Sequence, residues 1–149
     1  MKRLLLAAAL LGGAQLASAQ TAAPAKSLNR QTFNLHAAGE NQYGYAQAVL
    51  VGNTLYISGT VHPGKTMAEQ VAGIYRTLEK TLAHHGLGFQ HVVKENVYTV
   101  DLNAFPQENE LRKKYYNGVY PTATWVEVKR LLMPSALVEI ELIAMKPTP

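Results

Sequence analysis

Two short stretches near the C-terminus carry most of the information about the fold: residues 120–128 read YPTATWVEV, and residues 138–141 read VEIE. Alternating β-branched and polar residues of this kind are typical of strands. Between them lies Met133-Pro134-Ser135, which is typical of a turn. We therefore predict a strand over residues 122–131, a turn, and a last strand over residues 137–143.

Three stretches further upstream also have strand character: residues 45–51, 54–58 and 92–100. The first two are separated by Gly52-Asn53, and two turn residues between such runs predict a hairpin. A further strand at residues 31–36 is a weaker candidate, which we set aside from the predicted order.

A helix with clear start and stop signals is predicted between the second and third of these strands. Thr66 and Glu69 have the spacing of a capping box, and Gly86 is a typical stop after the last turn. Apolar residues recur at helical spacing in between: Met67, Val71, Ile74, Leu78 and Leu82.

A second helix is predicted to begin near Pro106 and to end at Asn117-Gly118. We place Leu111 and Tyr115 on its buried stripe, and we assign the basic run 112–114 to favourable interaction with the negative end of the helix. The order β-β-α-β-α-β-β predicts an α+β fold, in which two helices pack on one face of a mixed sheet.

The N-terminus has the three parts of a secretory signal peptide. Lys2-Arg3 forms the charged region, residues 4–16 form an uncharged and mostly apolar run, and Ala17-Ser18-Ala19 forms a cleavage site. We expect residues 1–19 to be removed, residues 20–29 to form a flexible leader and residues 30–149 to form one domain. The expected location is periplasmic or secreted; the alternative is an uncleaved anchor or a first helix of the domain.

Composition narrows the function classes. Loss of the signal peptide lowers the formal net charge from +4 to +2, which does not favour a nucleic-acid partner. The chain has no cysteine, which excludes disulfides, thiolate catalysis and cysteine-ligated metal. The sequence has no phosphate-binding loop and no metal-ligand spacing, so we expect no cofactor, no metal and, after signal cleavage, no membrane association.

Three blocks in the same order resemble the RidA/YjgF family of reactive intermediate deaminases, also called UK114 or L-PSP: residues 45–59, residues 97–116, and the C-terminal pair of strands. The resemblance implies a chorismate-mutase-like α+β fold. It also implies a homotrimer with small-molecule pockets between its subunits.

The chain departs from the family pattern at the position that matters most for deamination. Where the family's deaminases carry an arginine that grips the substrate carboxylate, this chain has Ala123, and Trp125 stands where a small residue is usual. Alanine supplies no donor for a carboxylate. Arg130 matches a different family arginine, and the loop over residues 61–67 is shorter than in typical deaminases.

The resemblance also implies a set of site residues. Glu139 matches a pocket glutamate that handles water, so it is the candidate general acid or base; the alternative is a surface or interface carboxylate. Tyr45, Ser58 and Asn109 match substrate-binding positions, although each also suits a structural hydrogen bond.

Carrying the family pattern over, Ala123 and Trp125 face the pocket. Trp125 either fills the space of the missing arginine or forms a stacking platform beside Glu139. His62, in the shortened loop, either reaches a pocket or is solvated.

We therefore expect an exported RidA-like protein whose small-molecule ligand is uncharged or cationic, acting as a hydrolase or deaminase with Glu139 handling water. We do not expect efficient deamination of 2-iminobutyrate. The alternative is a non-catalytic module on the same fold that binds small molecules or stabilises proteins.

Overall fold

The computed structural model describes residues 28–148. The predicted signal peptide, and the leader as far as residue 27, lie outside the described residues. The elements, in chain order, are β1 (Arg30–Phe33), α1 (Ala37–Tyr43), β2 (Ala48–Val51), β3 (Thr54–Thr60), α2 (Met67–His84), η1 (Phe89–His91), β4 (Val92–Thr99), η2 (Phe105–Glu108), α3 (Asn109–Tyr116), β5 (Thr122–Glu127) and β6 (Val138–Met145).

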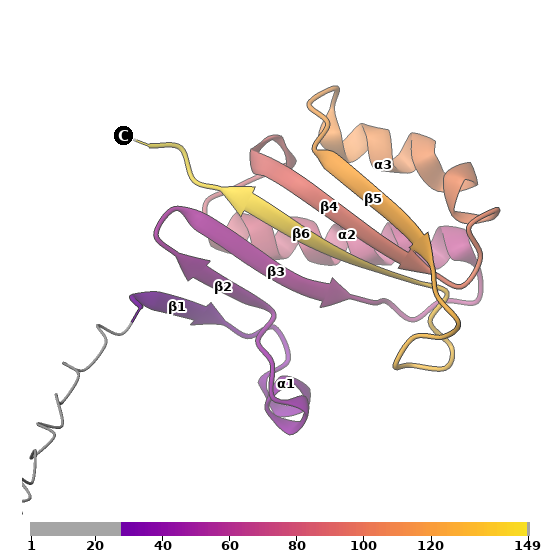
Figure 1. Ribbon diagram of the computed structural model, residues 1–149, viewed down its shortest axis with the longest axis horizontal. Helices are drawn as coiled ribbons and strands as arrows, with labels where there is room; N and C mark the ends of the chain where they lie inside the picture. The colour runs from indigo at the N-terminus through magenta and orange to yellow at the C-terminus, as the bar shows by residue number, and fades with distance from the viewer. Residues whose placement is uncertain (1–27, 149) are drawn as a thin grey trace, which may run out of the picture.

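The six strands form one mixed sheet in the order β1-β2-β3-β6-β4-β5. Only β4 and β5 pair in parallel; the other neighbours are antiparallel. α2 runs across one face of the sheet, with α3 on the same side, near β5 (Figure 1). The predicted α+β fold with a mixed sheet is confirmed.

Alternation along β6 explains how the sheet divides into a buried and an open face. Val138, Ile140 and Leu142 are buried in the core beneath the helices, whereas Glu139 and Glu141 point to the other face. We call these the helix face and the open face of the sheet.

The capping box predicted at the start of α2 is present. The Thr66 hydroxyl accepts a hydrogen bond from the backbone N–H of Glu69 at 3.2 Å, and the Glu69 carboxylate accepts from the backbone of Thr66. Gly86 adopts φ +71° just past the end of the helix, a conformation that glycine takes without steric cost. None of the helices in residues 28–148 is long and apolar enough to cross a bilayer.

Two elements at the N-terminal end differ from the sequence prediction. β1 belongs to the sheet, pairing with β2, and its Phe33 stacks on His84 at the end of α2 with ring centroids 4.0 Å apart. The predicted order of five strands and two helices is therefore wrong by one strand and by the short helix α1. Both elements are short, and β1 depends on contacts with residues about 50 positions away, which no local pattern reveals.

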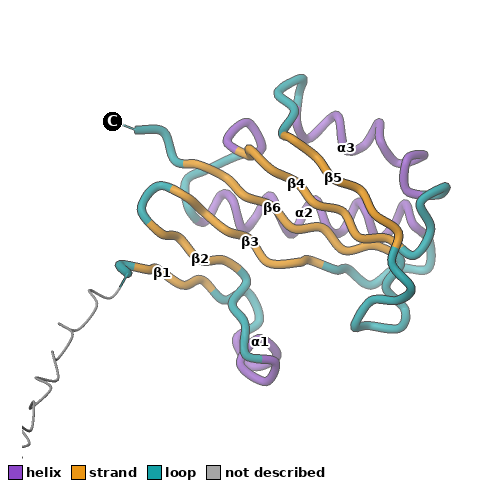
Figure 2. Tube along the Cα trace, in the orientation of Figure 1, coloured by secondary structure: helices purple, strands orange, loops and turns teal. Residues whose placement is uncertain are grey.

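The two C-terminal strands also differ from the prediction of adjacent strands joined by a turn. β4 lies between β5 and β6, so residues 128–137 form a connection past the end of β4 (Figure 2). β5 ends at Glu127 rather than at residue 131. As the last strand in the order, β5 has one edge without a partner strand within the described chain.

The second helix is shorter and differently oriented than predicted. The turn η2 precedes α3, and the residues of α3 that are buried are Arg112 and Tyr116; Leu111 and Tyr115 are only partly buried. The assignment of Arg112 to the helix dipole is therefore wrong, because a carboxylate on β4 draws its side chain inward, as described below.

Candidate functional site

Glu139 projects from the open face of β6 and lies directly over Gly59 of β3. A Cβ atom at position 59 would overlap with Glu139 Oε1, so only glycine leaves room for the carboxylate. The β3–β6 register shifts between Ile57 and Thr60, which places this glycine in an irregular part of the ladder. The position of Glu139 thus depends on the absence of a side chain on the neighbouring strand.

The carboxylate of Glu139 has an unusual electrostatic environment. Partial burial raises its pKa above the ordinary carboxyl value, and the charge of Glu141 adds to this effect. The nearby hydrogen-bond donors do not bind Glu139, because Asn96 and Tyr98 donate to the carboxylate of Glu141 at 2.6 Å and 3.1 Å. A carboxyl group with a raised pKa and free lone pairs is suited to exchange protons with a ligand.

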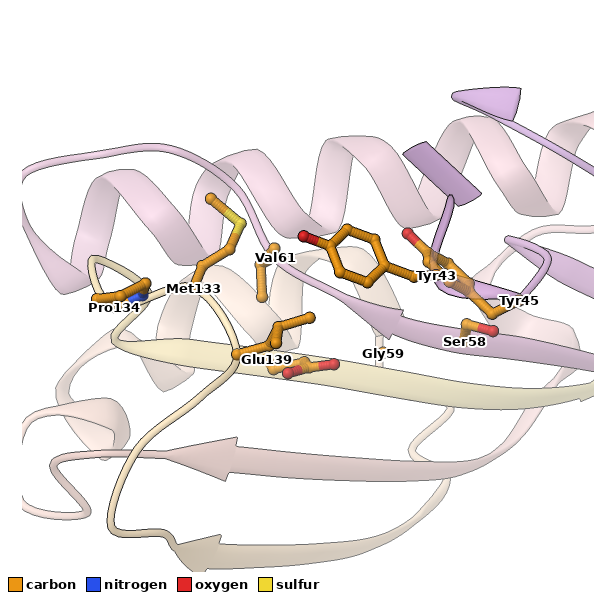
Figure 3. Close-up of a pocket in the computed structure, with 9 residues that line it drawn as sticks. Tyr43, Tyr45, Ser58, Gly59, Val61, Met133, Pro134 and Glu139 are labelled. Carbon is orange, nitrogen blue, oxygen red and sulfur yellow. The ribbon is translucent and has the colours of Figure 1, made fainter. Parts of the chain in front are cut away.

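A cavity of about 640 Å³ opens at Glu139. Figure 3 shows the carboxylate beside Gly59, with tyrosines from one side of the cavity and methionine and proline from the other. The lining residues are Tyr43, Tyr45, Ser58, Gly59, Val61, Leu132, Met133, Pro134 and Glu139. Glu139 is the one charged residue among these nine, so the cavity combines apolar walls with a single acidic group.

The tyrosine wall is positioned by α1 and the turn that follows it. Gly44 adopts φ +73° at the end of the helix and separates Tyr43 from Tyr45. Burial raises the pKa of the Tyr45 hydroxyl, and the charges of Glu40 and Glu139 add to the shift, so this hydroxyl stays protonated and able to donate.

Ser58 lies in the cavity wall but already makes a structural hydrogen bond. Its hydroxyl donates to the carbonyl oxygen of Ala46 at 2.6 Å, which links β3 to the residues preceding β2. The hydroxyl oxygen keeps its lone pairs for a ligand donor. Of the six residues predicted for the site, the structure brings Tyr45, Ser58 and Glu139 together in this cavity.

The other three predicted residues, Asn109, Ala123 and Trp125, do not line the cavity. Ala123 and Trp125 pair with Glu95 and Val97 of β4, which are buried on the helix face. Within a single chain, Trp125 and Glu139 therefore lie on opposite faces of the sheet, and the interpretation of Trp125 as a platform beside Glu139 does not hold within the chain.

Trp125 instead packs against side chains of its own chain. Its ring meets Phe105 edge-on with centroids 5.0 Å apart, and the guanidinium carbon of Arg112 lies 5.5 Å from the ring centroid. The cation next to this indole is thus supplied by the protein itself.

Arg112 is held by a buried carboxylate that the sequence did not single out. Its Nε donates to Glu95 at 2.6 Å, and the hydroxyls of Tyr75 and Tyr116 donate to the same carboxylate at 2.6 Å and 2.9 Å. Glu95 lies next to Ala123 in the sheet. Arg112, which binds this neighbour of Ala123, is consequently already paired with an internal anion.

Two buried polar atoms near this cluster have no hydrogen-bond partner in residues 28–148: Oδ1 of Asn109 and Nε1 of Trp125. Asn109 is the first residue of α3 and makes no capping bond, so the alternative that it caps this helix is not supported. Buried polar groups of this kind normally bind a water molecule, a ligand or a partner chain.

Comparison with known proteins identifies the family. The family model described as Endoribonuclease L-PSP matches residues 36–146. The chain belongs to the RidA/YjgF family. Among curated relatives it is 35% identical to a RutC family protein of Aquifex aeolicus over 111 residues, which are 68% of this chain and 88% of the relative.

A relative from Rattus norvegicus is named 2-iminobutanoate/2-iminopropanoate deaminase and is also 35% identical over 111 residues, covering 68% of this chain and 80% of the relative. Among solved structures, a YjgF/YER057c/UK114 family protein of Mycobacterium tuberculosis matches with a TM-score of 0.74 and 28% identity, over 78% of this chain and 99% of that one. These similarities agree with the resemblance read from the sequence.

Sequence reasoning missed several residues that shape the cavity. Tyr43 lies in a segment to which the sequence analysis assigned no element, and Met133 was assigned only to a turn. Gly59 appeared only as the residue after the predicted strand 54–58. Its spacing from Glu139 becomes meaningful only when β3 and β6 are known to be neighbours.

Proposed function

We propose that this chain is an exported RidA-family protein that binds an uncharged or cationic small molecule and hydrolyses or deaminates it, with Glu139 handling the proton and the attacking water. One observation carries the proposal: the cavity around Glu139 has a single charged wall residue, which is acidic. A carboxylate substrate entering there meets repulsion and no basic partner, whereas an iminium or amine meets a counter-ion.

The buried side chains around Glu95 and Arg112 on the helix face also favour an uncharged or cationic substrate. Ala123 offers no donor, and the nearby Arg112 is paired with Glu95. A guanidinium committed to an internal carboxylate has little free charge for a substrate anion.

We further propose that the chain forms a homotrimer in which the two groups of site residues meet across a subunit interface. One group is Tyr45, Ser58 and Glu139; the other is Asn109, Ala123 and Trp125. Two facts support this arrangement. The outer edge of β5 has no partner strand in the described chain, and Asn109 Oδ1 and Trp125 Nε1 are buried without a hydrogen-bond partner in residues 28–148. Native mass spectrometry measures the assembly, and a monomer at micromolar concentration would count against the proposed interface.

An RNA substrate, which the name of the family model suggests, receives little support. The basic run at 112–114 does not present three free charges, because Arg112 is buried against Glu95 and Lys113 pairs with Glu110 at 2.7 Å. RNA binding needs an exposed basic surface.

The substrate charge is tested by comparing 2-iminobutyrate with neutral imines formed from simple amines, using the wild type and Ala123→Arg. We expect the wild type to hydrolyse the neutral or cationic imines, and Ala123→Arg to shift the preference toward the carboxylate. Efficient wild-type turnover of 2-iminobutyrate would overturn the proposal. If no imine, amide or lactam is turned over but a ligand co-purifies, the chain is a binding module.

The role of Glu139 is tested by Gly59→Ala, which leaves the carboxylate in the chain but displaces it. We expect a loss of about 10- to 100-fold in turnover or ligand affinity, because a misplacement of about 1 Å can cost up to about 100-fold. Gly39→Ala is the matched control, since nothing lies within 4 Å of the added methyl group. Equal activity of the two variants would remove Glu139 from the mechanism.

A further inference from the structure

A second cavity, of about 560 Å³, adjoins the Glu139 cavity and shares Tyr45, Gly59, Val61 and Met133 with it. We call it the α1–α2 cavity, because it is lined by residues of α1 and α2 and of the loop that leads into α2. Its polar wall residues are His36, Glu40, Tyr45, Gln47, Thr60, His62, Thr77 and Lys80. Neither Glu139 nor Ser58 belongs to it.

His62 is held in this cavity by a specific arrangement. A Cβ atom at Gly73 would overlap with the imidazole, and the three atoms nearest to that position all belong to the ring of His62. Glycine inside a helix costs stability relative to alanine. At this position in α2 it provides the space in which the histidine ring rests.

The tautomer of His62 follows from its hydrogen bond. Nδ1 lies 2.8 Å from the carbonyl oxygen of Pro63, and a carbonyl only accepts, so Nδ1 carries a proton and donates. In the neutral ring, Nε2 is then an acceptor that this bond leaves free.

A lysine on the same stripe of α2 completes the site. Gly73, Thr77 and Lys80 are spaced i, i+4 and i+7, so they share one side of the helix. Lys80 is exposed and lines the cavity together with Thr77 and His62, so its ammonium group is the cation available to a ligand there. Lys80 forms no ion pair within residues 28–148.

The acidic wall residue Glu40 keeps its negative charge, which the positive charge of Lys80 in the same cavity offsets, and its oxygens are engaged in structural hydrogen bonds. Glu40 is buried, and its two oxygens accept hydrogen bonds from four donors: the backbone N–H groups of Leu35, His36 and Gln47, and the side-chain amide of Asn34. With its lone pairs used in this way, Glu40 acts as a fixed structural anchor for α1.

We propose that the α1–α2 cavity binds a phosphate group, either as free hydrogen phosphate or as a small phosphate monoester. A phosphate has oxygens that accept from Lys80 and, in its hydrogen form, an O–H that donates to Nε2 of His62. A carboxylate provides only the acceptors. The site shares Tyr45, Gly59, Val61 and Met133 with the Glu139 cavity, but its ligand groups, His62 and Lys80, do not line that cavity.

The test is a titration of the purified protein with inorganic phosphate, methyl phosphate and acetate at constant ionic strength, followed by NMR of the backbone amides. We expect saturable shifts around Val61 and residues 73–80 with phosphate or methyl phosphate, and binding at least about 10-fold weaker with acetate. The stronger of the first two ligands tells whether a free ion or an ester is preferred. Shifts that do not saturate, or equal binding of acetate, would overturn the proposal.

Three variants localise the site. His62→Phe keeps a ring on Gly73 but removes both nitrogens, and Lys80→Gln removes the ammonium group; each is expected to weaken phosphate binding about 10-fold. Arg76→Gln is the matched control, because it removes the same charge from the same helix at a position that does not line the cavity. If Arg76→Gln weakens binding as much as Lys80→Gln, the effect is one of net charge and the site does not exist.

Discussion

The negative charge of Glu139 is unfavourable in the folded chain, since the surrounding protein removes part of its hydration and Glu141 lies two positions along the same strand. The neighbouring donors are engaged with Glu141. A partly buried charge without a counter-ion is common at functional sites and costs stability. The structural reading of Glu139 as an ordinary surface carboxylate does not account for the glycine that makes room for it.

Glu139→Gln should therefore stabilise the protein at neutral pH. The pKa of Glu139 is raised on folding, so the native state binds the proton more tightly than the unfolded state. Wild-type stability then falls as pH rises from the ordinary carboxyl pKa through the raised value. We expect Glu139→Gln to have the higher Tm at pH 7 and the two proteins to converge at low pH. A wild type that is the more stable of the two at pH 7 contradicts the inferred environment.

At the scale of single elements, α2 is the best-defined helix in both sequence and structure. Its start is fixed by reciprocal hydrogen bonds between Thr66 and Glu69, and nothing in this arrangement depends on the rest of the fold. α1 is the opposite case, because its seven residues carry no such signal and are held by the buried Glu40. Helix α2 could therefore be predicted from local rules, and helix α1 could not.

Thr66→Ala should lower the free energy of unfolding by about 1 kcal/mol, because the backbone N–H of Glu69 loses its acceptor. Urea unfolding followed by circular dichroism measures the change. Thr66→Ser is the matched control, since serine retains the hydroxyl and should stay within a few tenths of the wild type. A serine variant as unstable as the alanine variant shows that the methyl group, and not the cap, is important.

At the scale of the whole molecule, the buried carboxylate of Glu95 joins three elements. It accepts from Tyr75 on α2 and from Arg112 and Tyr116 on α3, while its own backbone belongs to β4, which lies between β6 and β5. Glu95 and Arg112 are both buried. The packing of both helices on the sheet therefore depends on the pair of Glu95 and Arg112. Removing only one of the two residues leaves the other as an uncompensated buried ion.

Arg112→Met should destabilise the protein by about 3–5 kcal/mol, because Glu95 then remains buried without its cation. The double variant Glu95→Gln/Arg112→Met should be the more stable of the two, since the amide oxygen still accepts from the tyrosines and no charge is buried. Chemical unfolding of both variants gives the comparison. A double variant no more stable than Arg112→Met would mean that lost packing, and not the unpaired charge, causes the effect.

Local chemistry in the chain was enough to predict the α+β class, the capped helix α2 and the hairpin at Gly52-Asn53, because strand alternation, caps and turns depend on residues only a few positions apart. The family was predicted from the resemblance of three sequence blocks. The strand order depends on contacts between distant segments. It alone set β4 between β5 and β6, and it placed Glu139 on the open face and Trp125 on the helix face. Gly59 beneath Glu139, His62 on Gly73 and Glu95 against Arg112 are each pairs of residues from different elements, and for that reason only the folded chain revealed them.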